Sequence, residues 1–254
     1  MEIVLPKRRF ALLRRIVRRL MPGVYGWMLG NAKLRRVFRV MKGKQQVSLE
    51  DDSTQIFTAI YETHFWEDDE SRSGGGSNLY ATERIRKSIP GLFVKYGVRS
   101  VLDIPCGDFF WFKEMHLDLD RYVGGDIVAP LIASVAAKYA SSARTFHVID
   151  ITKDALPESD LILVRDCFIH LSSEAIFSAL TNILRSRIRY LLTTHFAETQ
   201  SNVDIAIGSF HPVNLCASPF NFPPPLELLD DYAKGNMPHQ LALWRIDDLR
   251  TEPW

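Results

Sequence analysis

The chain has 254 residues, of which 46% are hydrophobic and 24% are charged, and this composition favours a globular protein over a disordered or fibrous one. Its three cysteines are far apart and show neither a CxxC pair nor zinc-site spacing, so we predict no metal site, no disulfides and a reducing, cytoplasmic compartment. The net charge of +1 hides an asymmetry: residues 1–44 hold 13 basic residues and one acid, whereas the remainder holds 18 basic and 29 acidic residues.

This asymmetry predicts a basic N-terminal arm over residues 1–50, followed by a domain over residues 51–254. Residues 10–20 read FALLRRIVRRL, which places apolar residues on one helical face and arginines on the other. Such a helix either lies peripherally on an anionic membrane surface or docks on the domain with solvated arginines. A mitochondrial transit peptide is a third interpretation. Nucleic acid is the weakest partner, because no nucleic-acid motif is present and the domain is acidic.

The first elements of the domain are predicted to be helical. Residues 53–66 form a helix with Ser53 as its cap, and the polar loop 67–77, EDDESRSGGGS, is interpreted as a flexible hinge. A helix then covers residues 80–87, and a second short helical piece extends to residue 96.

Beyond residue 97, short apolar strands alternate with helical segments. The predicted strands cover 98–104, 122–127, 145–151, 160–164 and 189–195, and the predicted helices cover 110–115, 130–139 and 173–184. This alternation predicts an α/β fold, with a mostly parallel sheet and helices on both faces.

The pattern stops at residues 196–238, which are irregular and contain six prolines. We predict a packed lid there, followed by a last strand over 240–246. The lid contains Asn202, Asp204, His211 and Asn214, side chains that suit a sugar or another polyhydroxylated acceptor, although such residues also dominate turns.

Three acids follow three successive predicted strands. Asp103 lies in VLDIPCGDF (101–109), Asp126 in YVGGDI (122–127) and Asp150 in FHVIDIT (146–152). In open α/β sheets, ligands bind beyond the carboxyl ends of the strands, and a carboxylate there can accept both hydroxyls of a ribose. Gly107 allows the backbone to approach such a ligand closely.

As a set, these segments and DLILVRDCFIHL (160–171) resemble the four motifs of the class I S-adenosylmethionine-dependent methyltransferases, over about residues 78–195. The resemblance implies a Rossmann-like methyltransferase sandwich and S-adenosylmethionine as cofactor. Asp103 and Gly107 would shape the methionine side, Asp126 would bind the ribose, and Asp150 would contact the adenine. The cofactor site implied in this way comprises Asp103, Pro105, Gly107, Asp126, Ile127, Asp150, Ile151 and Asp166.

Two residues depart from the family pattern. Pro105 and Phe109 stand where two glycines are usual, which argues against a nicotinamide dehydrogenase, whose pyrophosphate needs close glycine contact. They also motivate an alternative hypothesis, a non-catalytic module that binds S-adenosylmethionine. An RNA methyltransferase recruited by the basic arm is a further alternative.

If the methyl acceptor is a hydroxyl group, a general base should remove its proton. The candidates are Asp166, His170 and His195, which lie where the fourth and fifth predicted strands end. Each has a structural interpretation as well: Asp166 could pair with a neighbouring arginine, and His170 could line the adenine pocket. The sequence therefore predicts a methyltransferase, with O-methylation of a glycan or related small molecule as the expected reaction.

Overall fold

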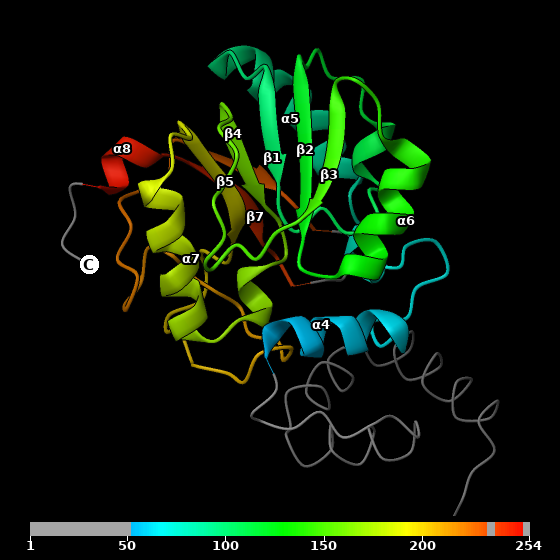
Figure 1. Ribbon diagram of the computed structural model, residues 1–254. Helices are drawn as coiled ribbons and strands as arrows, with labels where there is room; N and C mark the ends of the chain where they lie inside the picture. The colour runs from blue at the N-terminus through cyan, green and yellow to red at the C-terminus, as the bar shows by residue number, and fades with distance from the viewer. Residues whose placement is uncertain (1–51, 233–236, 251–254) are drawn as a thin grey trace, which may run out of the picture. The chain divides into compact units, whose positions relative to one another are not determined.

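The computed structural model describes residues 52–232 and 237–250, so the predicted basic arm lies outside the described residues. The described part contains a seven-stranded sheet with the spatial order β3-β2-β1-β4-β5-β7-β6 (Figure 1). In chain order the strands are β1 Ser100–Asp103, β2 Arg121–Asp126, β3 Arg144–Val148, β4 Leu161–Val164, β5 Tyr190–His195, β6 Glu227–Asp230 and β7 Gln240–Arg245.

The first five strands run parallel to one another. Strand β7 is antiparallel to both β5 and β6. After β3 the chain crosses to the other half of the sheet, so the strand order reverses between the neighbouring strands β1 and β4. The carboxyl ends of the parallel strands lie on one edge. This arrangement confirms the predicted mostly parallel sheet.

Helices cover both faces of the sheet, as predicted. Val101 and Leu161 point into one core, which contains apolar residues of helices α5 (Glu83–Tyr96) and α6 (Ala129–Tyr139). Leu102 and Ile162 point into the other core, together with helices α7 (Ser173–Arg185) and α8 (Ile246–Leu249). Neighbouring strand residues thus face opposite cores, as a period of two requires. Within the described residues, none of the helices is both long and apolar enough to span a membrane.

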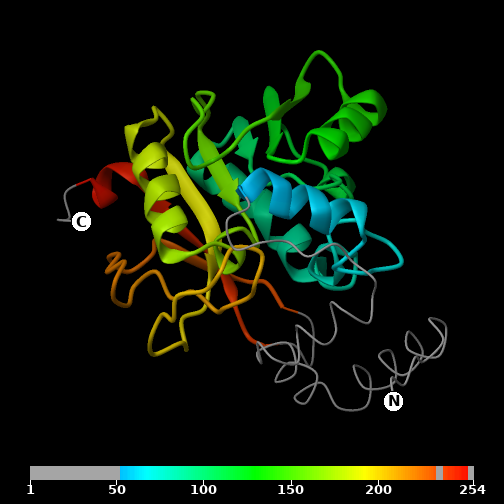
Figure 2. The same ribbon diagram turned by 60° about the horizontal axis from the view of Figure 1, so that its bottom comes forward.

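Helix α4 (Ser53–Glu62) lies across the carboxyl edge of the sheet in both ribbon views (Figures 1 and 2). Phe57 of this helix packs against both cores. On its other side the helix meets the lid, because a Cβ added at Gly208 would come within 2.8 Å of Ile56. Helix α4 therefore covers the edge where the sequence places the ligand site.

Several helices differ from the prediction. Helix α4 ends at Glu62, with Asp52 rather than Ser53 in the N-cap position. The two pieces predicted over 80–96 are one helix, α5, which continues through Pro90 although a proline inside a helix removes one backbone hydrogen bond. The helix predicted over 110–115 is only a 3-10 turn, Phe112–Glu114. There the Asp108 side chain accepts from the N–H of Phe110 at 3.2 Å, and such local bonds compete with helix formation.

The lid is packed, as predicted, but it is less irregular than expected. Phe220 and Phe222 are buried in the α7 core, whereas Phe210 stays 45% exposed. Strand β6 lies inside the segment predicted to be irregular. Within the described residues its ladder partner is β7, so the strand forms only because a later segment pairs with it.

Candidate functional site

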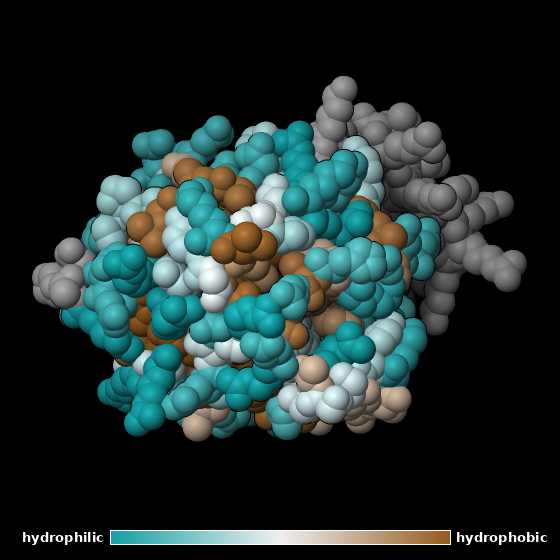
Figure 3. Space-filling model, turned by 90° about the horizontal axis from the view of Figure 1, so that it is seen from above, coloured by the Kyte–Doolittle hydropathy of each residue, from teal (hydrophilic) through white to brown (hydrophobic). Residues whose placement is uncertain are grey.

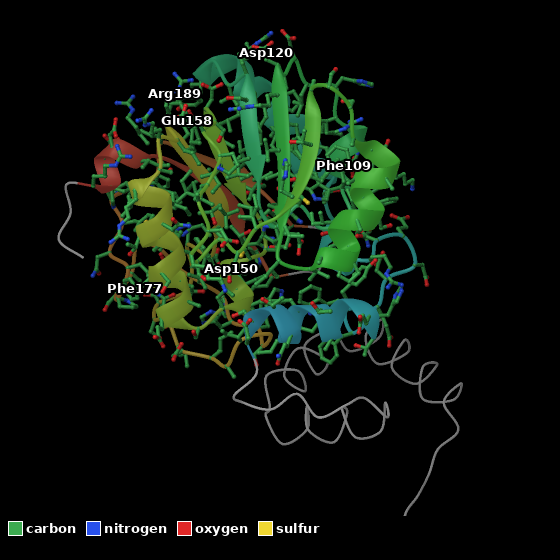
Figure 4. All side chains as sticks on the ribbon, viewed as in Figure 1. Phe109, Asp120, Asp150, Glu158, Phe177 and Arg189 are labelled. Carbon is green, nitrogen blue, oxygen red and sulfur yellow. The ribbon has the colours of Figure 1, made fainter. Side chains whose placement is uncertain are left out.

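Acidic side chains follow the neighbouring strands β1, β2 and β3 at the carboxyl edge. Asp103 ends β1, Asp126 ends β2, and Asp150 lies two residues beyond β3. Their exposed fractions are 2%, 5% and 7%. Figure 4 shows Asp150 at this edge and Asp120, which precedes β2, at the opposite edge. The structure thus brings the three predicted acids to one edge of the sheet.

Asp103 is held by Tyr122, whose hydroxyl donates to its Oδ2 at 2.6 Å. Burial raises the pKa of Asp103 to about 7, although this hydrogen bond and the charge of Arg165 oppose the shift. A cation placed beside this carboxyl group would favour its ionised form.

Asp126 fixes the turn that follows β1. Its Oδ2 accepts from the N–H of Gly107 at 3.2 Å, and its Oδ1 accepts from the N–H of Val128 at 3.0 Å. Burial raises the pKa of Asp126 to about 6, against the effect of these backbone donors. The ends of β1 and β2 are therefore joined at Gly107.

The bulky ring of Phe109 is buried in a core. Phe109 adopts a φ of 59° and is only 2% exposed. Its ring packs in the α5–α6 core among the rings of Phe112, Tyr122, Tyr139 and Phe146. Phe109 replaces a glycine that is usual in the family, but its ring does not block the predicted ligand position. Pro105, the other departure, is partly buried in the same turn.

Asp150 is fixed by its own loop. The backbone N–H and the hydroxyl of Thr152 donate to its Oδ1 at 2.9 and 2.6 Å, and Lys153 forms an ion pair at 3.2 Å. Burial opposes ionisation, yet these partners hold the pKa of Asp150 below its ordinary value. Ile127 and Ile151, the predicted apolar contacts, each follow an acid of this edge; Ile127 is partly buried and Ile151 is buried.

A second polar cluster surrounds Arg165, just beyond β4. Arg165 donates to both carboxylate oxygens of Asp231 at 2.8 and 3.0 Å, and it pairs with Asp166 at 3.2 Å. Oxygen and nitrogen atoms of Asp166, Asp231 and His239 lie within 4.8 Å of one another, close enough to hold a metal ion. The Arg165 guanidinium provides a positive charge between the two acids.

Asp166 sits in a left-handed backbone conformation, with a φ of 51°, next to Thr194 of β5. Burial opposes its ionisation, but the Arg165 guanidinium, aided by His239 and His170, holds the pKa of Asp166 below its ordinary value. The predicted pairing with a neighbouring arginine is present. Asp166 is consequently an anion rather than a strong base.

His170 has a defined tautomer. Its Nδ1 lies 2.6 Å from the carbonyl oxygen of Ser209, and because a carbonyl only accepts, Nδ1 must carry the proton. Burial lowers the pKa of His170, so the ring is neutral at pH 7 with its lone pair on Nε2. The ring also stacks on Trp66, with centroids 4.8 Å apart.

His195 has the opposite arrangement. Its Nδ1 accepts from the N–H of Leu215 at 3.2 Å, so the lone pair of the neutral ring is already used. The residue is 2% exposed, and burial lowers its pKa to about 4. This geometry argues against the predicted role of His195 as general base.

The cover segment, residues 66–77, contains the largest departure from the sequence analysis, which interpreted 67–77 as a flexible hinge. Ser71 is 2% exposed, and the Asp108 carboxylate accepts from its hydroxyl at 3.1 Å and from the N–H of Arg72 at 2.8 Å. Ser73 in turn accepts from the N–H of Asp108 at 3.0 Å. These residues were not predicted as part of the site. The signal for them in the sequence is the cluster of serines and glycines before the first strand.

The polar residues of the lid are engaged within or beside the lid. Asn202 donates to the carbonyl oxygens of Asn214 and Ser218, and Asn214 donates to that of Thr199. His211 contacts the carbonyl oxygen of Val203, and Asp204 accepts from the first N–H of α7. These side chains therefore make the backbone hydrogen bonds typical of turns. This was one of the two roles expected for them, the other being sugar binding.

A surface cavity of the described residues does not include Gly107 in its lining. It is a groove of about 740 Å³ along the outer face of α7, lined by Thr152, Lys153, Glu174, Phe177, Ser178, Thr181, Asn182 and Arg185. Convergent buried acids are better evidence of a ligand site than an open groove, so we assign the site to the carboxyl edge.

The opposite, amino edge of the sheet has a different character. Figure 3 shows this face from above as largely hydrophilic, with scattered hydrophobic residues. Exposed ion pairs join Arg99 to Asp118 and Asp120, and Arg189 to Asp160. Such exposed pairs contribute little to stability or binding.

No protein-family model matches this chain, and no curated protein matches it in sequence. Solved structures do match. A methyltransferase dependent on S-adenosylmethionine from Leishmania major has a TM-score of 0.58 and 13% identity, over 81% of this chain and 89% of its own. Human N-acetylserotonin methyltransferase, crystallised with S-adenosylmethionine, has a TM-score of 0.55 and 15% identity, over 86% of this chain and 68% of its own.

A third match is an N-methyltransferase of Bradyrhizobium japonicum in complex with S-adenosylhomocysteine, with a TM-score of 0.56 and 16% identity, over 77% of this chain and 98% of its own. At such identities the likeness concerns the fold. The strand order, the antiparallel β7 and these neighbours together show that the chain has the fold of the S-adenosylmethionine-dependent methyltransferases.

Proposed function

We propose that this chain is a methyltransferase that uses S-adenosylmethionine as methyl donor. The observation that carries the proposal is the row of buried acids at the ends of β1, β2 and β3, beside Gly107, in a sheet of the methyltransferase fold. Two of the matched structures reported above were crystallised with this donor or with its demethylated product, which supports the same cofactor here.

The donor fits the residues present at this edge. Asp126 would accept from the ribose hydroxyls and Asp150 from the adenine amino group, with Ile127 and Ile151 supplying apolar contacts. Asp103 and Gly107 would face the amino-acid end. When bound, the donor supplies a methyl group on a positively charged sulfur, ready for transfer to a nucleophile. Burial raises the pKa of Asp103 to about 7, and the positive charge of the bound donor would favour the ionised form of this carboxyl group.

His170 is the general base in this proposal. Its neutral ring carries a lone pair on Nε2, the form that accepts a proton from an acceptor hydroxyl. The anionic Asp166 nearby would stabilise the imidazolium that results, since its charge favours the protonated ring. Asp166 thus supports the base.

The acceptor is proposed to be a hydroxyl-bearing small molecule, with a glycan as the leading candidate. The Oε1 atom of Gln240 is buried and has no hydrogen-bond donor among the described residues. A hydroxyl group of the acceptor could donate to this oxygen, which supports an acceptor that carries hydroxyls. Trp66 and Phe210 flank His170 and could receive the face of a sugar ring. The lid amides do not add support, since they bond the lid itself.

The basic arm is proposed to hold the enzyme on an anionic membrane surface on the cytoplasmic side. The charge of +12 over residues 1–44 supports this placement, because clustered arginines attract anionic lipid headgroups.

Calorimetry with S-adenosylhomocysteine tests the cofactor site directly. Replacing Asp126 by alanine should weaken binding about 10- to 100-fold, because hydrogen bonds to a charged acceptor are lost. Asp120→Ala is the matched control, since Asp120 is exposed and precedes the same strand. Equal affinity of wild type and Asp126→Ala would refute the assigned site.

Labelled donor incubated with glycan, lipid, RNA and protein fractions then identifies the acceptor, and labelled RNA would instead support the RNA methyltransferase.

A further inference from the structure

A side chain of β5 bridges the point where β4 leaves the sheet. The parallel ladder pairs Val164, the last residue of β4, with Thr193, whereas β5 continues to His195. Beyond Val164 the chain turns away, and the N–H of Asp166 donates to the Thr194 hydroxyl at 2.8 Å. The same hydroxyl donates to the Oδ1 of Asp166 at 3.3 Å. Thr194 therefore binds Asp166 twice, once at the backbone and once at the carboxylate.

Asp166 depends on this support because its backbone is strained. Its φ of 51° lies in the left-handed region, which is uncommon for a residue with a side chain and persists only where the surroundings fix it. Arg165 pairs with the second carboxylate oxygen at 3.2 Å. Thr194 is 1% exposed, so solvent has little access to replace its hydroxyl. The two oxygens of Asp166 are thus held by two different residues, Oδ1 by Thr194 and Oδ2 by Arg165.

The strained turn leads directly to the proposed base. The 3-10 helix Phe168–His170 begins two residues after Asp166, and the Nδ1 of His170 is fixed at the carbonyl oxygen of Ser209. Burial lowers the pKa of His170; among the charged and titratable groups that act on its ring, Asp166 raises the pKa and His211 lowers it. Asp166 is therefore the acid that favours the protonated ring.

We propose that Thr194 is a positioning residue for the general base, which it controls through Asp166. This inference rests on the proposed function, in which the Nε2 of His170 takes the proton of the acceptor hydroxyl and the ring becomes an imidazolium. The Thr194 hydroxyl holds the Asp166 carboxylate where its negative charge stabilises that imidazolium. Arg165 and His239 also act on Asp166, but through their own charges. Thr194 is neutral, so its removal tests the placement of Asp166 rather than the charge around it.

Thr193 provides a matched control in the same strand. It is 0% exposed, and its hydroxyl donates to the carbonyl oxygen of Val164 at 2.8 Å. Both threonines thus bond the end of β4, one to a backbone carbonyl and the other to Asp166. Valine keeps the shape of threonine and removes the hydroxyl, so Thr193→Val and Thr194→Val each lose buried hydrogen bonding and should lower the melting temperature similarly.

Methyl transfer from labelled S-adenosylmethionine, measured with the full chain and the cell fraction that accepts the label, is the first test. Thr194→Val should slow transfer at least about tenfold, because a displaced carboxylate stabilises the imidazolium less well. Thr194→Ser keeps the hydroxyl and should remain within about threefold of wild type, and Thr193→Val within about twofold. Calorimetry with S-adenosylhomocysteine should give the same affinity for all four proteins, because the change concerns the base and not the donor.

NMR titration of the His170 ring in the full chain is the second test, and it needs no acceptor. With ring-labelled histidine, and His170→Gln to assign the signal, the titration midpoint should fall in Thr194→Val and stay at the wild-type value in Thr194→Ser and Thr193→Val. Asp166→Asn should lower the midpoint too, and adding Thr194→Val to it should lower it no further, since both act through one charge.

A His170 midpoint unchanged in Thr194→Val, or equal slowing of transfer by the two valine variants, would overturn the role of Thr194. The Asp166→Asn comparison gives the same decision if Thr194→Val alone is poorly folded, because an unchanged midpoint there removes the charge that Thr194 is proposed to place. A wild-type chain that labels none of the fractions would instead contradict the proposed function.

Discussion

Neighbouring carboxyl groups at the candidate site have different charge states because their partners differ. Asp150 and Asp166 have cationic partners, Lys153 and Arg165, and their pKa values fall. Asp126 has backbone donors but no cation within ion-pair distance among the described residues, and burial raises its pKa to about 6. Asp126, which is assigned to the ribose, is thus a buried acid without an ion-pair partner among the described residues.

The affinity for S-adenosylhomocysteine should therefore rise with pH. A pKa raised by burial means that the free protein holds a proton on Asp126 below about pH 6, and a protonated carboxyl group accepts less well from the ribose hydroxyls. Affinity should fall about tenfold for each pH unit below that value. Calorimetry across this range checks the profile.

Asp126→Asn should remove the decline in affinity below about pH 6. An Asp126→Asn protein with the wild-type profile would show that another group controls binding.

A second prediction at the residue scale concerns Arg165 and the effect of removing metal ions. Because its guanidinium already forms ion pairs with both Asp166 and Asp231, methyl transfer and donor binding should be unchanged by dialysis against a chelator. Activity lost on chelation and restored by a divalent ion would assign the cluster of Asp166, Asp231 and His239 to a metal instead.

At the scale of elements, the lid is held by side chains that act on its own backbone. Asn202 donates to two lid carbonyl oxygens and accepts from the N–H of Asn214 at 2.9 Å. It thereby joins the start of the lid to residues 214–218, which precede the buried Phe220 and Phe222.

Asn202→Ala should lower the melting temperature by about 4–8 °C, if about 2 kcal/mol of hydrogen bonding is lost. Gln200→Ala, an exposed amide two residues away, should shift it by about 1 °C or less. Thermal unfolding followed by circular dichroism measures both. An unchanged melting temperature together with a raised KM for the acceptor would return Asn202 to the sugar-binding role.

The strands and the acids at their ends could be predicted because local apolar runs and strand-end acids determine them. Three features could not be predicted. Strand β6 depends on β7, which follows it in the chain; the cover segment depends on Asp108, more than 30 residues away; and the direction of Phe109 depends on an aromatic core assembled from several elements. Each is decided by a distant partner, which the local pattern does not reveal.

At the scale of the whole molecule, charge is divided between the two ends of the sequence, +12 over residues 1–44 and −11 over the rest. An acidic domain should be repelled by an anionic surface, so the arm must supply the attraction. The proposal of membrane binding through the arm rests on this division.

The full chain should sediment with vesicles that contain anionic lipid and remain in solution with neutral vesicles. Removing residues 1–44 should abolish sedimentation and leave the binding of S-adenosylhomocysteine intact, and added salt should release the full chain because it screens the arginines. Sedimentation that survives the truncation would refute anchoring by the arm.

The antiparallel edge of the sheet has a consequence for how the protein can be shortened or tagged. Strand β7 fits between β5 and β6, although it is the last of the three to be synthesised. A chain stopped before Gln240 would lose two strands rather than one, since β6 would have no neighbour left in the described sheet. Asp231, which follows β6, would then lose the strand that holds it beside Arg165. The last few residues of the sheet thus secure an arginine more than 70 positions earlier in the chain.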